Sequence, residues 1–151
     1  MKLEAGKHYL AVCYSNLARS PFVAAYLERR ARELKIPVEV DSAGLVVQEK
    51  GRKQFDACLA QWADIVLVMQ DSMQREIQDW EELRGKKLIN LDIPDIYSPS
   101  FDDSRICPNM TPTEVALYFE AKRNVEGFKI GKRLFEKLLK ARLEERLRLN
   151  L

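Results

Sequence analysis

The chain has 151 residues, of which 46% are hydrophobic and 32% are charged. These values are typical of one globular domain, so we expect a single domain over residues 1–151 and neither a fibre nor a disordered chain. Lysine and arginine number 25 and aspartate and glutamate 23, which gives a formal net charge of +2. That charge is too small to indicate a nucleic-acid partner.

The hydrophobic segments are short, because the longest unbroken apolar run extends only from Ile65 to Met69. A membrane span needs about 20 such residues, so we expect no membrane span and a cytoplasmic location. Cysteines stand at positions 13, 58 and 107, with no C-x-x-C pair, and the chain has one histidine. This pattern argues against a disulfide framework and a zinc site. We expect no metal and no other cofactor.

Short apolar runs alternate with segments of helical periodicity along the first two thirds of the chain. The runs at 9–12, 38–41, 65–69 and 87–91 are typical of buried strands. Ser20 and Pro21 suit the N-cap and first position of a helix that ends before Pro37, and further helices are indicated at 57–62 and 72–80. Because parallel strands need crossover helices, we predict an α/β, three-layer, doubly wound fold with a central four-stranded parallel sheet.

The last third of the chain is less regular. Residues 94–109 contain three prolines and no clear period, which predicts a long loop of the kind that is often functional. A capping box at Thr111 to Glu114 opens a helical region, and Phe128, Phe135 and Leu143 belong to one apolar face of its final part. We expect that part to be a solvated amphipathic helix.

The most informative segment runs from Val12 to Pro21 and reads V-C-Y-S-N-L-A-R-S-P. Cys13 ends the first predicted strand, and an arginine follows after five intervening residues, where a helix begins. The backbone N–H groups between them can converge on one point and add to those of the helix start. This predicts a phosphate-binding loop between the first strand and the first helix, formed by Tyr14, Ser15, Asn16, Leu17, Ala18 and Arg19.

Three side chains of this segment have a chemical role in that prediction. The positive end of the helix and the nearby arginine favour the thiolate of Cys13, which makes it a nucleophile. The planar guanidinium of Arg19 can hold two phosphate oxygens through the transition state, which lysine cannot do as well. The hydroxyl of Ser20 can donate to the sulfur of Cys13 when the sulfur leaves.

These residues resemble the phosphate loop of the low-molecular-weight protein tyrosine phosphatases, which reads V-C-x-G-N-x-x-R-S-P. Ser15 stands in place of the glycine, and Ala18 in place of a second cysteine found in many members. The likeness continues at 41–44, at 63–69 and at 93–97, and it implies that Asn16 and Ser42 hydrogen-bond to shape the loop. It also implies an aromatic wall of the substrate cleft at Tyr97.

A phenolate leaving group requires a proton, so the reaction needs a general acid. From the residues alone, Asp92, Asp95, Asp102 and Asp103 are equal candidates. The resemblance selects Asp95, which follows Ile93-Pro94 as in the family, although Ile96 replaces the proline that usually comes next.

The sequence therefore predicts a phosphate monoester hydrolase, a protein tyrosine phosphatase that acts through a cysteinyl-phosphate on phosphotyrosine-containing proteins or small aryl phosphates. Two alternatives stay open. The first is an arsenate reductase, since some of these enzymes resemble the same fold and loop. Their chemistry uses additional cysteines to resolve a cysteine–arsenic adduct as a disulfide, and here Cys58 and Cys107 are not a closely spaced pair. A non-catalytic phospho-binding module would keep the loop without turnover.

Overall fold

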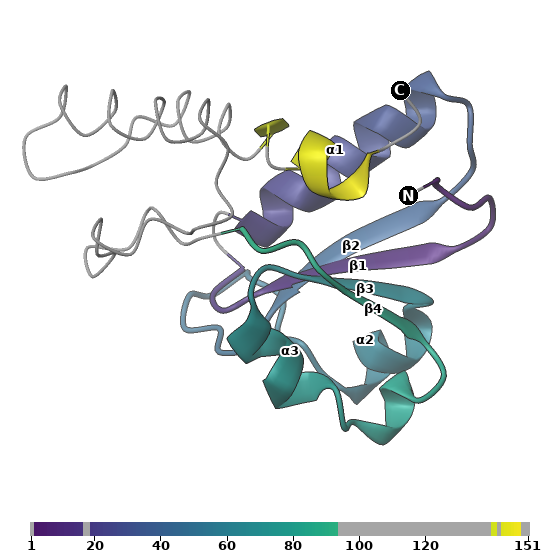
Figure 1. The fold of residues 1–151 in the computed structure, drawn as a ribbon. Helices are drawn as coiled ribbons and strands as arrows, with labels where there is room; N and C mark the ends of the chain where they lie inside the picture. Colours follow the sequence, from purple (N-terminus) through teal and green to yellow (C-terminus); the bar gives the residue numbers. More distant parts are fainter. Residues whose placement is uncertain (1, 17–18, 94–139, 142, 149–151) are drawn as a thin grey trace, which may run out of the picture.

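The structure is a computed structural model that describes residues 2–16, 19–93, 140–141 and 143–148. Strands and helices alternate along this part of the chain (Figure 1). The strands are β1 (His8–Cys13), β2 (Glu39–Gly44), β3 (Ile65–Val68) and β4 (Lys87–Asn90), and the helices are α1 (Arg19–Glu33), α2 (Ala57–Trp62), α3 (Asp71–Ile77) and the 3-10 turn η1 (Glu81–Leu83).

The four strands form one parallel sheet in the order β2-β1-β3-β4. Helix α1 covers one face of this sheet, and α2 and α3 cover the other (Figure 1). The predicted α/β fold with a central four-stranded parallel sheet is therefore confirmed. The strands added after β1 lie on opposite sides of it, β2 on one side and β3 with β4 on the other. In such folds ligands bind beyond the carboxyl ends of the strands at this switch point.

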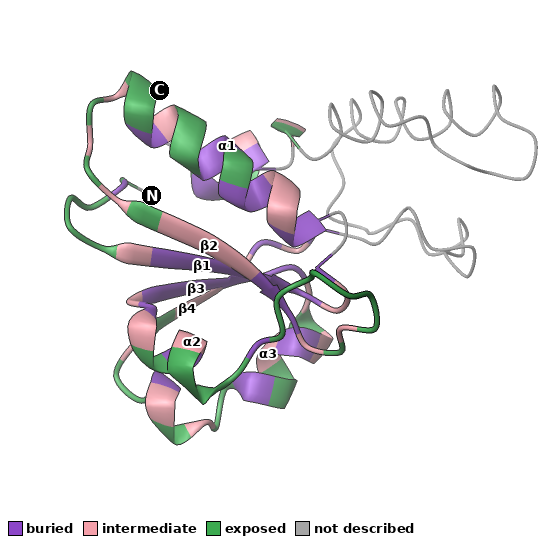
Figure 2. Cartoon of the chain, turned by 180° about the vertical axis from the view of Figure 1, so that it is seen from behind, coloured by how far each residue is buried: buried purple, intermediate pink, exposed green. Residues whose placement is uncertain are grey.

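Burial explains the composition of the two central strands. Every residue of β3 is buried, and so is every residue of β1 after His8, because helices cover both faces (Figure 2). Continuous apolar runs suit strands in this position. From α1, Val23, Leu27 and Ala31 pack into the same core at helical spacing.

Two element boundaries differ from the prediction in ways that affect the site. Helix α1 begins at Arg19, so Ser20 lies inside its first turn and does not precede it as an N-cap. Strand β2 continues through Gly44, three residues beyond the predicted end at Asp41, and pairs Val12 with Ala43 and Cys13 with Gly44. The added residues bring β2 alongside the end of β1.

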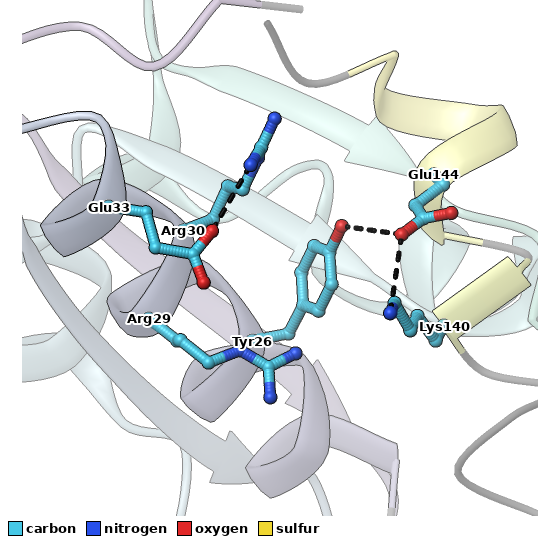
Figure 3. Close-up of a pocket in the computed structure, with 6 residues that line it drawn as sticks. All are labelled: Tyr26, Arg29, Arg30, Glu33, Lys140 and Glu144. Carbon is cyan, nitrogen blue, oxygen red and sulfur yellow. Dashed lines mark hydrogen bonds and ion pairs between the residues drawn. The ribbon is translucent and has the colours of Figure 1, made fainter. Parts of the chain in front are cut away.

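A helical segment near the C-terminus packs beside α1 (Figure 1). Its Leu143 and Leu147, one turn apart, are buried in the main core. Tyr26 of α1 donates its hydroxyl hydrogen to Glu144, with 3.3 Å between the oxygens, next to a pocket of about 250 Å³ (Figure 3). The predicted apolar position at Leu143 is thus confirmed, whereas the predicted loop at 94–109 and the helix from Thr111 lie outside the described residues.

Candidate active site

The chain leaves β1 at Cys13 and enters α1 at Arg19, at the carboxyl edge of the sheet. Residue Gln70, just beyond β3, and Ile93, just beyond β4, come to the same edge, since both accept hydrogen bonds from Arg19. The predicted phosphate loop therefore lies at the topological switch point, where an α/β sheet binds its ligands.

The sulfur of Cys13 lies among hydrogen-bonding groups. Its Sγ is 2.9 Å from Oγ of Ser20, and it accepts a hydrogen bond from the backbone N–H of Asn16 at 3.2 Å. Cys13 is 3% exposed and Ser20 is fully buried. A negatively charged sulfur at this position can thus accept hydrogen bonds from a hydroxyl and a backbone amide. This arrangement suits a nucleophile and a leaving group.

The loop is braced from inside by a serine and an asparagine. Asn16 has a left-handed backbone with φ of 54°, a conformation that asparagine adopts more readily than most residues. Ser20 donates its hydroxyl hydrogen to Oδ1 of Asn16 at 3.0 Å, and the carbonyl oxygen of Ala43 lies 3.3 Å from the same hydroxyl. Ser15 does not have a positive φ, so its own backbone conformation does not require a glycine at that position.

The end of β2 and the two residues after it support the loop from outside. Leu45 and Val46 donate backbone N–H groups to the carbonyl oxygens of Cys13 and Tyr14, at 2.9 and 2.8 Å. A Cβ placed on Gly44 would come within 2.7 Å of the Tyr14 carbonyl oxygen and 2.8 Å of the Asn16 nitrogen. Only glycine fits at this close approach of two backbones.

Arg19 is 4% exposed and is held by two acceptors from other strand ends. Its Nη1 donates to Oε1 of Gln70 at 2.8 Å and to the carbonyl oxygen of Ile93 at 2.9 Å. The guanidinium is therefore fixed by side-chain and backbone oxygens of elements that follow β3 and β4.

A chain of hydrogen bonds connects this arginine to the loop. Nε2 of Gln70 donates to Oγ of Ser72 at 2.9 Å, and the Ser72 hydroxyl lies 2.7 Å from the Tyr14 hydroxyl. Arg19, Gln70, Ser72 and Tyr14, which we call the arginine network, link α1, the start of α3 and the phosphate loop.

The structure brings some of the predicted site residues into contact, whereas others lie outside the part of the chain that it describes. Cys13, Asn16 and Ser20 contact one another, and Arg19 and Tyr14 join them through the arginine network. Ser42 donates its backbone N–H to its neighbour Asp41 at 2.8 Å, and no hydrogen bond to Asn16 occurs among the described residues, where Asn16 Oδ1 accepts from Ser20 instead. The predicted residues Leu17, Ala18, Asp95 and Tyr97 lie outside the described part of the chain.

Three contributors were missed by the reasoning from sequence: Gln70, Ser72 and Gly44. A weak signal was available for the first two, because polar residues directly after a buried strand of an α/β sheet often face a ligand. Gly44 lies in the segment 41–44 that the resemblance includes, but its contact with the loop could not be predicted because it depends on the register of β1 and β2.

The described residues include neither a cluster of metal-binding side chains nor a helix that could span a membrane. They contain no group of three or more His, Cys, Asp or Glu side chains placed to hold a metal ion. Within the same residues, no helix combines the length and apolar character that crossing a membrane requires.

The chain as a whole is similar to several solved structures. No protein-family model and no curated protein matches the chain. The YwlE arginine phosphatase from Geobacillus stearothermophilus is 25% identical, with a TM-score of 0.50 over 94% of this chain and 93% of that one. A low molecular weight phosphotyrosine phosphatase from Vibrio cholerae O395 is 15% identical, with a TM-score of 0.59 over 94% and 93%.

A third solved structure agrees with these two. The low molecular weight protein tyrosine phosphatase from T. tengcongensis is 20% identical, with a TM-score of 0.57 over 93% of this chain and 99% of that one. Each likeness covers nearly the full length of both chains, so it concerns the whole architecture and not a shared motif. The chain thus has the fold of the low molecular weight protein tyrosine phosphatases, as the residues from Val12 to Pro21 led us to expect.

Proposed function

We propose that the protein hydrolyses phosphate monoesters, with phosphotyrosine in proteins as its substrate class, through a cysteinyl-phosphate intermediate. One observation carries the proposal: the sulfur of Cys13 is buried between a backbone amide and the Ser20 hydroxyl, in the loop that ends at the anchored Arg19. Solved structures with this fold that are named as tyrosine or arginine phosphatases support it.

In the first step, the thiolate of Cys13 attacks phosphorus in line, so that an S–P bond forms as the bond to the ester oxygen breaks. Arg19 and the loop amides stabilise the equatorial oxygens. Asp95 gives its proton to the leaving oxygen. In the second step, Asp95 takes a proton from water, which attacks phosphorus, and the S–P bond breaks while Ser20 donates to the departing sulfur.

The test is hydrolysis of phenyl phosphate and of a phosphotyrosine peptide by the purified protein in the presence of a chelator. We expect phosphate release, and we expect Cys13→Ser to abolish it while phosphate still binds. Cys58→Ser is the matched control, because Cys58 is exposed on α2 and its replacement should leave turnover unchanged.

Two results would redirect the proposal. Stoichiometric capture of the phosphopeptide without phosphate release would indicate a binding module. Release from a phosphoarginine peptide, but not from phosphotyrosine, would keep the nucleophile and change the substrate class. A cytoplasmic site of action remains part of the proposal, and cell fractionation tests it.

A further inference from the structure

We propose that Gln70 is a positioning residue for Arg19 in the phosphatase reaction, and that its neutral amide preserves the positive charge that Arg19 offers to phosphate. The inference rests on the proposed function. The contact that carries it is the hydrogen bond of 2.8 Å from Nη1 of Arg19 to Oε1 of Gln70, between residues that are 51 positions apart.

The two bonds of Nη1 fix the orientation of the guanidinium. A guanidinium Nη1 carries two hydrogens, and here one goes to Gln70 and the other to the carbonyl oxygen of Ile93. Gln70 and Ile93 together therefore orient the planar group that, in the proposed reaction, holds the phosphate oxygens.

The amide of Gln70 is itself held in one orientation. Its Oε1 must face the arginine donor, and its Nε2 donates to Ser72, whose hydroxyl lies 2.7 Å from that of Tyr14. A flipped amide would place an NH₂ group against the guanidinium and lose the bond from Arg19. The Arg19 contact therefore fixes the oxygen of the carboxamide as the end that faces the guanidinium, and leaves the NH₂ group to Ser72.

Helix capping does not explain glutamine at this position. Gln70 is the N-cap residue of α3, yet its side chain makes no capping hydrogen bond. Serine, threonine, aspartate and asparagine are the residues that cap helices well. The side chain extends instead to Arg19 and Ser72, where its length is needed.

Neutrality at position 70 has a consequence for substrate affinity. A carboxylate at the same place would form an ion pair with Arg19, and its charge would oppose a phosphate dianion in a site of low exposure. An amide holds the guanidinium without adding negative charge. We therefore expect anchoring and charge to be separable by substitution.

Two variants separate them. Gln70→Ala removes the anchor, so kcat for phenyl phosphate should fall about tenfold, as expected for the loss of a hydrogen bond to a charged group, with KM changed less than threefold. Gln70→Glu keeps an acceptor, so kcat should fall less than in Gln70→Ala, but the Kd for inorganic phosphate should rise at least tenfold. Gln78→Ala, an exposed glutamine that follows α3, is the control and should change neither.

Calorimetry with inorganic phosphate and thermal unfolding accompany the kinetics, so that a folding defect is recognised by its lower Tm. The inference is overturned if Gln70→Ala has the kcat of Gln78→Ala, or if Gln70→Glu binds phosphate as tightly as the wild type. A wild-type protein that binds phosphate without turnover would refute the proposed function alone, and the phosphate affinities of the two variants would then decide the role of Gln70. A wild-type protein that binds no phosphate would refute both.

Discussion

Arg146 and Asp92 form an ion pair with 2.9 Å between Nη2 and Oδ2, and it joins the C-terminal helical segment to the residues that follow β4. Asp92 has a left-handed backbone with φ of 52°. The next residue, Ile93, accepts a hydrogen bond from Arg19. The ion pair thus fixes the bend at Asp92, and the residue after the bend, Ile93, anchors Arg19. It also directs the Asp92 carboxylate toward Arg146.

Removing the ion pair should have a small effect on stability and a larger one on the site. We expect Arg146→Ala to lower the free energy of unfolding by about 0.5–1 kcal/mol, since the pair is about one-third exposed. We also expect a decrease of about threefold in kcat, because Ile93 loses part of its support. Urea unfolding and steady-state kinetics measure both quantities. Arg52→Ala, which removes an exposed ion pair with Glu49, should change kcat by no more than experimental error.

Gly44→Ala should disrupt the phosphate loop. The added Cβ meets only backbone atoms at 2.7 to 2.9 Å, and backbone cannot move aside as a flexible side chain can. We expect a loss of about 1–3 kcal/mol in the free energy of unfolding, as for other overpacked sites, together with a large decrease in phosphate affinity.

Gly51→Ala provides the comparison for this substitution. Gly51 has open space around it but a positive φ, so alanine there costs stability through backbone strain without reaching the loop. If both alanine variants bind phosphate equally well, the close contact at Gly44 does not shape the site.

Arg19→Lys should lower kcat by roughly a hundredfold or more, with a smaller effect on KM. A lysine keeps the charge, but one ammonium cannot bond Gln70 and Ile93 and also present a planar fork to two phosphate oxygens. Kinetics on phenyl phosphate provide the measurement. A variant altered only in KM would show that the arginine serves ground-state binding alone.

Asp95→Asn should slow the enzyme in proportion to the basicity of the leaving group. Phenyl and tyrosyl phosphates need a proton at bond cleavage and should be affected severely, whereas an activated aryl phosphate should be affected little. In the pH profile of kcat/KM, the decrease at alkaline pH that the general acid causes should disappear. Asp92→Asn is the matched comparison, and if it shows the graded pattern while Asp95→Asn does not, the acid is Asp92.

Alkaline pH should destabilise the protein through Tyr26. Burial, together with the adjacent Glu144, raises the pKa of Tyr26 above its usual value of 10.0. As pH rises past 10, the unfolded chain releases this proton while the folded protein retains it, so the free energy of unfolding falls. Burial also raises the pKa of Tyr9, which adds to the same slope. Urea unfolding at pH values from about 9 to about 11 should show a shallower decline for Tyr26→Phe than for the wild type.

The positions of the four strands could be predicted because apolar runs and crossover segments are local properties of sequence. The end of β2 could not, since residues 41–44 are polar or small and become a strand only through pairing with the end of β1. The start of α1 was placed two residues late, at Pro21 instead of Arg19, because Ser20 is a good N-cap residue by type and its hydroxyl instead contacts Cys13. In both cases a contact between different elements outweighed the local preference of the sequence.

The residues of the candidate site also differ in whether the local sequence identifies them. Cys13, Arg19 and Ser20 share one short segment whose spacing identifies them. Gln70 follows β3, the strand next to β1, and contacts Arg19 from there. Its position after a buried strand is a weak signal of a site residue, but it does not identify the guanidinium as the partner. The predicted roles of Asp95 and Tyr97 remain predictions.

The hydroxyl of Ser20 has a single hydrogen, and three acceptors surround it at 2.9 to 3.3 Å: Cys13 Sγ, Asn16 Oδ1 and the Ala43 carbonyl oxygen. While Cys13 is a thiol, its own hydrogen can go to Ser20, whose hydrogen then goes to Asn16. When the sulfur is ionised, the hydroxyl can turn toward it, and Asn16 Oδ1 then loses the hydrogen bond from Ser20. The backbone N–H of Asn16 donates to the same sulfur at 3.2 Å, so the protonation state of Cys13 is coupled to both the side chain and the backbone of Asn16.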